Sequence, residues 1–440
     1  MSAQRYFVFS DIHLTVPCAW SAFRDHEALG ACLEHLAGLP QHTVILAGDT
    51  FDFLLLADYE GFDPARSADR MAAILDHPAS APVLAGLRAL VRRGHRLALL
   101  AGNHDPEVLQ TSVRKLFGAR VGLTELELGG DVLLHEPPGL PPVHGRRIDA
   151  GQQFGFVVHG DRWDVANYID RTAFRRAAEA GEKFRLPPGS RLVYRILRKL
   201  KHERRDWVDQ VKPEIESVLP LLLYLDWPLV WDILKKDYLL TANLLCGRLR
   251  ARLGWVNLGD AGPPRGGPNV PEELDAFVEA LRDALPEAER DDLLRTLAGA
   301  EVLAPPRPRP GAATLADHAG FWRWLLRAWL MRSRRRSRFF AEDADDELSD
   351  VFAPSLPPGL DLLVAGHTHG PRHVAGTPTY LNSGTWTPVG PLPDDEIEAV
   401  IDELERGKLP TAESPRTLVE ITAGTALTAK LRMWRGGGLV

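Results

Sequence analysis

Cysteine is scarce in this 440-residue sequence, and its placement builds no recognisable site. Cys18, Cys32 and Cys246 are odd in number and far apart, which disfavours a disulfide framework and fits no common spacing of zinc ligands. We therefore expect small buried side chains at these positions rather than redox or metal chemistry.

A targeting or membrane-spanning segment is also lacking. The first residues do not form the basic, apolar and cleavage regions of a signal peptide. The longest apolar run, 218–231, is broken by Pro220, Asp226 and Pro228, and falls short of the roughly 18–20 clean residues that a membrane helix needs. A net charge of -7 disfavours nucleic acid as a partner of the whole surface. We expect a cytoplasmic protein, associated at most with the inner face of a membrane.

What the chain has is a hydrophobic content of 45%, enough for a substantial core. In its first third, strand patterns at 6–10, 43–47 and 96–101 alternate with helix patterns at 26–39 and 68–93. This order predicts right-handed β-α-β units and a largely parallel sheet, which places the chain in the α/β class.

Further strand patterns occur on both sides of a long helical stretch. They fall at 131–135, 155–159, 360–365, 379–382, 416–422 and 426–434, and we expect the last three to form an antiparallel meander. The stretch between them is rich in Arg, Trp and Leu and is broken by Pro/Gly tracts. We therefore predict a core in two parts, 1–162 and 356–440, around a helical insertion at 163–355 that serves as a lid or membrane-surface element.

Polar residues follow five of the predicted strands, often beside glycine. The carboxyl ends of strands in an open α/β sheet form its ligand crevice, so these residues should meet. In extended backbone, residues i and i+2 point to the same side. Asp11 with His13, and His367 with His369, can therefore each direct two side chains to the same place. The residues are Asp11, His13, Asp49, Asn103, His104, Asp105, His159, His367 and His369.

Such a mixture of oxygen and nitrogen donors suits Mn²⁺, Fe or Zn²⁺ better than Ca²⁺. A carboxylate such as Asp49 can bridge two ions about 3.5–4 Å apart. Each short motif is common by itself, but five of them in order, each after a strand, indicate a metal centre. We expect two divalent ions, with Mn²⁺ as the first candidate.

The ordered motifs D-x-H, G-D-x-x-D, G-N-H-[DE], H-G and G-H-x-H resemble those of the calcineurin-like metallophosphoesterases, over about residues 5–165 and 355–435. The resemblance implies a four-layer αββα sandwich. It also implies that one ion is bound by Asp11, His13, Asp49 and His369, and the other by Asp49, Asn103, His159 and His367.

In the same family pattern, His104 is not a ligand. The resemblance implies that it faces the substrate phosphate and stabilises or protonates the leaving oxygen, with Asp52 or Asp105 orienting its ring. Within the superfamily, the sequence is most similar to the UDP-2,3-diacylglucosamine pyrophosphatase-like branch, in which a helical lid follows the H-G motif. It differs from that branch in having His104 where the pyrophosphatases carry Arg, and in its longer insertion.

Two basic segments of the insertion, Arg191–Arg205 and Phe321–Phe340, combine arginine with apolar residues at helical spacing. Basic amphipathic helices of this kind bind anionic membrane surfaces, and Trp favours the water–lipid interface. Alternatively, the Trp and Leu side chains pack inside the insertion and the arginines are solvated. Nucleic-acid binding is the least favoured interpretation.

The sequence thus predicts a two-metal hydrolase of a phosphodiester or pyrophosphate bond, with a lipid-linked nucleotide among the candidate substrates. A phosphomonoesterase acting on phosphoproteins or small esters is the first alternative. The second is a membrane-peripheral scaffold with an inactive metal site, which the complete set of donors disfavours.

Overall fold

A computed structural model describes residues 3–123, 127–128, 131–132, 143–164, 167–198, 208, 210, 341–343, 356–390, 402–403, 406 and 412–440. The chain divides into two units, one made of Met1–Val218 with Ser333–Val440, the other of Leu219–Arg332. The second unit lies outside the described residues, as does the segment Phe321–Phe340, so the bounds of the insertion stay a prediction. Among the described residues, no helix combines the length and hydropathy needed to cross a membrane.

The first sheet has seven strands in the order β13-β12-β11-β1-β2-β3-β4. Strands β1 to β4 are parallel, as predicted, and the C-terminal strands extend the sheet on the other side of β1 in antiparallel fashion. The strands span Gln4–Phe9 (β1), Thr43–Ala47 (β2), Arg96–Leu100 (β3), Glu127–Leu128 (β4), Thr417–Ala423 (β11), Leu427–Arg435 (β12) and Gly438–Leu439 (β13).

The second sheet has six strands in the order β5-β6-β7-β8-β10-β9. Its central strands β7, β8 and β10 are parallel, and β6 forms an antiparallel hairpin with β7. The strands span Asp131–Val132 (β5), Val143–Ala150 (β6), Gln153–Val158 (β7), Leu362–Ala365 (β8), Arg372–Val374 (β9) and Thr379–Asn382 (β10).

The predicted C-terminal meander is wrong in one strand. β11 and β12 pair as an antiparallel hairpin, but β10 belongs to the second sheet, where it lies parallel to β8. The reason is that β10 buries both faces: Leu381 points between the sheets and Tyr380 points to the outer face. A strand covered on both sides fits the interior of a parallel arrangement.

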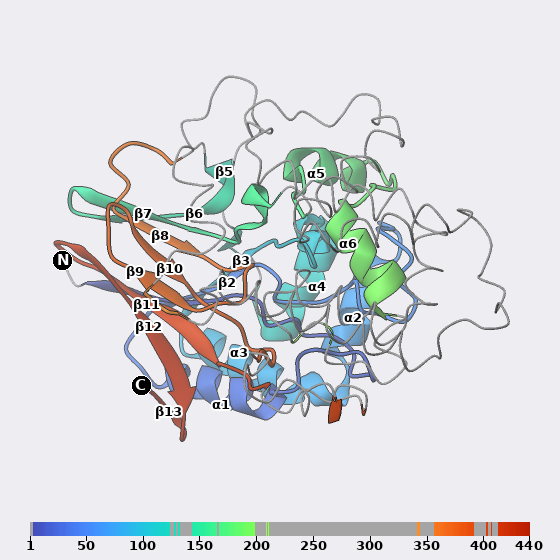
Figure 1. Ribbon diagram of the computed structural model, residues 1–440, viewed down its shortest axis with the longest axis horizontal. Helices are drawn as coiled ribbons and strands as arrows, with labels where there is room; N and C mark the ends of the chain where they lie inside the picture. The colour runs from blue at the N-terminus through green and yellow to red at the C-terminus, as the bar shows by residue number, and fades with distance from the viewer. Residues whose placement is uncertain are drawn as a thin grey trace, which may run out of the picture. The chain divides into compact units, whose positions relative to one another are not determined.

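Helices α1 (His26–Ala37) and α3 (Ala81–Arg92) lie side by side against the first sheet, with α2 (Ser67–Leu75) and α4 (Thr111–Val121) beyond them (Figure 1). Their close approach needs glycine, because a Cβ on Gly86 would lie 2.6 Å from Leu33 Cβ. The single helix predicted at 68–93 is in fact α2 and α3. Pro78, which lacks a backbone N–H, begins the turn that separates them.

Alternating side chains of the first sheet build two cores. Phe7 and Phe9 of β1 pack against the helices, whereas Val8 packs against the second sheet. A third cluster, with Phe156 and Trp163, covers the outer face of the second sheet. Two face-to-face sheets with flanking helices confirm the predicted α/β sandwich. The short helices α5 (Arg171–Glu179) and α6 (Pro188–Leu192) and a π-turn (Val193–Leu197) follow β7 along the chain.

Candidate metal centre

The predicted donors all lie at strand ends, but these ends belong to both sheets. Asp11, Asp49 and Asn103 follow β1, β2 and β3 of the first sheet, whereas His159 and His367 follow β7 and β8 of the second. The strand ends therefore meet as expected, but they come from two sheets rather than from one open sheet. The centre forms where the carboxyl ends of two stacked sheets meet.

The backbone at the centre is strained. Of the described non-glycine residues, only six have positive φ, and five of these are predicted donors: Asp11 (51°), His13 (57°), Asp49 (47°), His367 (72°) and His369 (62°). Left-handed backbone at such residues costs roughly 1–3 kcal/mol each. Strain of this kind persists where the surrounding structure fixes it, and it is concentrated at functional sites.

Asp105 is part of what fixes the turn that carries Asp49. Its buried carboxylate accepts hydrogen bonds from the backbone N–H groups of Gly102 (2.7 Å), Asp49 (3.2 Å), Thr50 (2.8 Å) and Phe51 (3.1 Å). Burial, together with the charge of Asp49, raises the pKa of Asp105 to about 6. Asp105 therefore holds the loop that carries Asp49. Of the two residues expected to orient the His104 ring, Asp52 and Asp105, it is not the one that does so.

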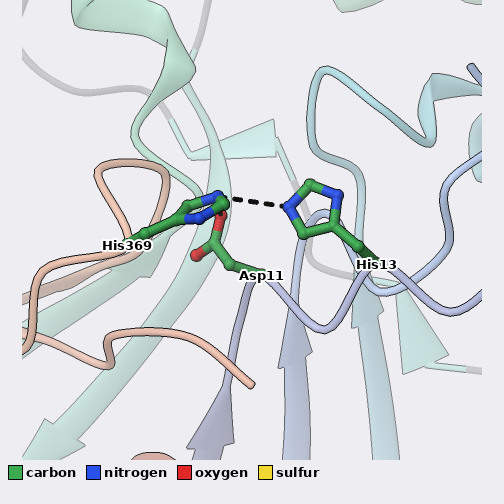
Figure 2. Close-up of side chains that lie close together, drawn as sticks. All are labelled: Asp11, His13 and His369. Atoms are coloured by element: carbon green, nitrogen blue, oxygen red, sulfur yellow. Dashed lines mark hydrogen bonds and ion pairs between the residues drawn. The ribbon is translucent and has the colours of Figure 1, made fainter. Parts of the chain in front are cut away.

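Asp11, His13 and His369 form the first half of the centre (Figure 2). The Nε2 atoms of the two histidines are 3.2 Å apart, and Nε2 of His369 lies 3.4 Å from Asp11 Oδ1. Two imidazole nitrogens that face one another attract only if one carries a proton, whereas both can bind the same cation. The arrangement therefore suits a metal ion.

The two oxygens of Asp11 differ in a way that fits a cation. Oδ2 accepts hydrogen bonds from the Ser10 hydroxyl and, at 2.9 Å, from the backbone N–H of His367. Oδ1 is buried and accepts no hydrogen bond from the described residues. A buried carboxylate oxygen without a donor is costly unless a cation binds it. Burial, the largest influence, raises the pKa of Asp11.

We refer to Asn103, His159 and His367 as the second half, although His367 belongs to none of the groups of His and Asp ligand atoms that lie within 4.8 Å of one another in the described residues. Nε2 of His159 lies 3.2 Å from Asn103 Oδ1, while its Nδ1 is 3.1 Å from the carbonyl oxygen of Ala47. The carbonyl accepts a proton from Nδ1, which leaves Nε2 to face the centre. The His367 ring stands nearly perpendicular to that of His159, with the ring centroids 5.3 Å apart.

Asp49 lies between the two halves. Its Oδ2 is 3.9 Å from Nε2 of His13 and 3.4 Å from Nε2 of His159. Its Oδ1 accepts the backbone N–H of His104 at 2.8 Å. One oxygen is thus fixed by the backbone, and the other occupies the place that a bridging carboxylate needs.

His104 lies at the edge of the centre. Its Nδ1 is 3.1 Å from Asp52 Oδ2, and the same oxygen is 3.0 Å from Nδ1 of His13. Asp52 therefore orients both rings, whose centroids are 4.7 Å apart. Burial opposes protonation of His104, but the carboxylates of Asp52 and Asp49 outweigh it and raise the pKa of His104 to about 9.

The charges of the centre are strongly linked. Burial favours a neutral Asp49, yet His159 and His104 outweigh this and hold the pKa of Asp49 well below its usual value. Burial likewise opposes protonation of His159, and the Asp49 carboxylate outweighs it, raising the pKa of His159 to about 10. Without a cation, protons on His159 and His104 offset the negative charge of the Asp49 carboxylate.

Three charged residues near the centre, Asp161, Asp164 and Arg171, had no role predicted from the sequence. Nε2 of His367 is 3.1 Å from Asp164 Oδ2. Arg171 donates to the carbonyl oxygen of Ala101 (2.8 Å) and to Asp161 Oδ1 (2.7 Å), so it joins the chain after β3 to the chain after β7. Asp161 stands directly after His159-Gly160 and could have been found by that position, whereas Asp164 belongs to no motif.

Part of the basic segment Arg191–Arg205 is described, and it packs on the core. Tyr194 is buried against Tyr59, with ring centroids 5.4 Å apart. Arg198 donates to the carbonyl oxygens of Leu56 (2.6 Å) and Tyr59 (2.9 Å). These contacts fix residues 194–198 on the loop that follows Asp52. Membrane contact by the rest of the segment stays a prediction.

Comparison with known proteins agrees with this geometry. Residues 4–212 match a family model described as calcineurin-like phosphoesterase. A search of curated proteins returned no match. Three groups of His and Asp ligand atoms in the described residues, each within 4.8 Å, draw on Asp11, His13, Asp49, His104, His159 and His369. Residues 4–212 are therefore similar to a calcineurin-like phosphoesterase domain, and the protein is a metal-dependent hydrolase of phosphate esters.

Proposed function

We propose that the centre holds two divalent ions and that the enzyme hydrolyses a phosphodiester or pyrophosphate bond. The first ion is assigned to Asp11, His13, Asp49 and His369, and the second to Asp49, Asn103, His159 and His367. The observation that carries this division is the position of Asp49 Oδ2, between one imidazole nitrogen of each half. Mn²⁺ suits the mixed donors, with Fe or Zn²⁺ as alternatives.

When bound, the two ions lower the pKa of water and neutralise the phosphoryl oxygens. The protein's own residues do the rest. His104 would donate a proton to the leaving oxygen, a role supported by its contact with Asp52 and by its raised pKa. Asp105 and the backbone N–H of His104 hold the Asp49 carboxylate in one orientation, so the centre is already in place when substrate arrives.

The substrate class rests on the likeness of the sequence to the pyrophosphatase-like branch, where a lid follows the H-G motif. A lipid-linked nucleotide, met at the cytoplasmic face of a membrane, fits this branch and the basic segments of the insertion. A phosphomonoesterase remains the alternative, because a protonated His104 would assist any poor leaving group.

The test is Mn²⁺-dependent hydrolysis of bis-p-nitrophenyl phosphate beside p-nitrophenyl phosphate. Asp49→Asn removes the shared carboxylate, and Asp69→Asn makes the same change at an exposed position on α2. We expect metal-dependent turnover of the diester that survives in Asp69→Asn and is lost in Asp49→Asn. Turnover of the monoester alone would replace the proposal by a phosphatase, and binding of metal without any turnover would favour the scaffold.

A further inference from the structure

Three of the predicted histidine ligands, His13, His159 and His367, share one feature: a ring nitrogen that lies within hydrogen-bond distance of an oxygen acceptor. Nδ1 of His13 is 3.0 Å from Asp52, and Nδ1 of His159 is 3.1 Å from the carbonyl of Ala47. In both rings, Nε2 then faces the other donors. An acceptor on one nitrogen selects the tautomer in which the other nitrogen carries the lone pair for a metal.

His367 follows the same pattern with its nitrogens exchanged. Its Nε2 is 3.1 Å from Asp164 Oδ2, so Nδ1 is the nitrogen left to bind an ion. Both side chains are largely buried, with 10% and 17% of their surfaces exposed.

Asp164 differs from the other two acceptors in its origin. Ala47 ends β2 and Asp52 ends the G-D-x-x-D motif that follows it. Asp164 instead lies five residues beyond His159, where the predicted insertion begins. Its position is fixed locally. Oδ2 also accepts from Asn167 Nδ2 (2.8 Å), and its carbonyl oxygen accepts the backbone N–H groups of Asn167 (2.9 Å) and Tyr168 (2.8 Å).

We infer that Asp164 is a positioning residue that aligns His367 for the second ion, and that it joins the beginning of the insertion to that half of the centre. The inference rests on the proposed two-ion function. It assigns to the insertion a direct influence on metal binding, in addition to any contact with substrate. Arg171 strengthens the connection, because it holds the same part of the chain to Asp161 and to the carbonyl of Ala101.

The test measures Mn²⁺ binding to the metal-stripped full chain by titration calorimetry, and the coupled-pair signal of two Mn²⁺ ions by electron paramagnetic resonance. Asp164→Ala removes the acceptor, and Asp164→Asn keeps an oxygen but removes the charge. The matched control is Asp170→Asn, an identical change at the N-cap of α5, where Asp170 Oδ1 accepts the backbone N–H of Ala173 and asparagine caps equally well.

We expect wild type and Asp170→Asn to bind two ions alike. Asp164→Ala should bind the first ion unchanged and the second about 10–100-fold more weakly, which is the usual effect of losing an outer partner of a metal ligand. The coupled-pair signal should disappear at limiting Mn²⁺. Asp164→Asn should fall between, because an acceptor remains.

Equal affinities in wild type and Asp164→Ala would overturn the inference, and so would equal weakening of both ions, which indicates a general structural role. Asp164→Asn supplies the same comparison if the alanine variant does not fold. Failure of the proposed reaction would be recognised separately. If binding of the second ion depends on Asp164 but no phosphodiester or pyrophosphate is hydrolysed, the positioning role is supported and the proposed reaction is rejected.

Discussion

The two halves of the centre are supported by different parts of the chain. The first half, Asp11, His13 and His369, depends on Asp52 and on motif residues of the two sheets. The second half includes His367, whose outer partner Asp164 lies outside every motif. Asp49 belongs to both. The difference suggests a division of roles, with one half fixed by the core and the other open to influence from the insertion.

The largest effect should come from the residue that the halves share. Asp49→Asn is expected to lower the affinity of both ions and to reduce kcat about a thousandfold or more, equivalent to ~4 kcal/mol of transition-state stabilisation. Metal content after gel filtration, together with kcat, measures this. Loss of a single ion with the other fully retained would mean that Asp49 is a ligand of one ion only. It would contradict the proposal that the two halves share Asp49.

His104 should separate chemistry from metal binding, because it is held by Asp52 and, in the proposed assignment, is a ligand of neither ion. His104→Asn is expected to reduce kcat by about 10²–10⁴-fold with both ions retained. Since a proton donor must be protonated, activity of the wild type should fall as pH rises through the His104 pKa. That pKa is about 9 without metal, and nearby cations should lower it. A pH profile that keeps this alkaline decline in the variant would exclude His104 as the acid.

Metal binding should release protons from the second half. The pKa of His159 is raised to about 10, so its ring is protonated at neutral pH and must lose that proton to bind an ion. Affinity should therefore rise with pH, up to tenfold per pH unit for each proton displaced. Calorimetry in two buffers of different ionisation enthalpy counts the protons, and a heat independent of the buffer would contradict the expectation.

The smallest effect should come from Arg198, which belongs to the basic segment Arg191–Arg205. Its side chain binds the loop 56–60 and contacts none of the predicted metal donors. Arg198→Gln should lower the free energy of unfolding by about 1–2 kcal/mol, because two carbonyls lose a charged donor. Metal affinity should not change. Thermal unfolding beside Arg176→Gln, exposed on α5, provides the control; weakened metal binding would show that the whole segment acts on the centre.

The donors could be predicted because each is marked locally, by a strand, a glycine and a short motif. Their distribution over two sheets could not, because strand pairing depends on partners distant in sequence, as when β1 pairs with β11. Asp164 escaped for a related reason. An aspartate in a loop becomes a partner of His367 only when β7 and β8 lie side by side, and the two residues are 203 positions apart.

Secondary structure was missed where the sequence pattern is weak. Helix α4 begins at Thr111 without a side-chain cap and buries only a few apolar residues, so its amphipathic pattern is faint. Strand β6 is rich in polar residues because it lies near the edge of its sheet. The helix predicted at 68–93 was joined across Pro78 because its apolar periodicity continues on both sides of the break.

The position of β1 has a consequence for how the protein can be made on the ribosome. β1 is synthesised shortly before one of its two neighbours, β2, but long before the other, β11. Until β11 emerges, the nascent chain has an open sheet edge at β1, a site that invites pairing with other chains. His13 must likewise wait for His369, 356 residues later. A chain truncated before β11 would leave this edge of β1 uncovered, and one truncated before His367 would also lack donors of the centre, so activity depends on segments that are synthesised far apart in time.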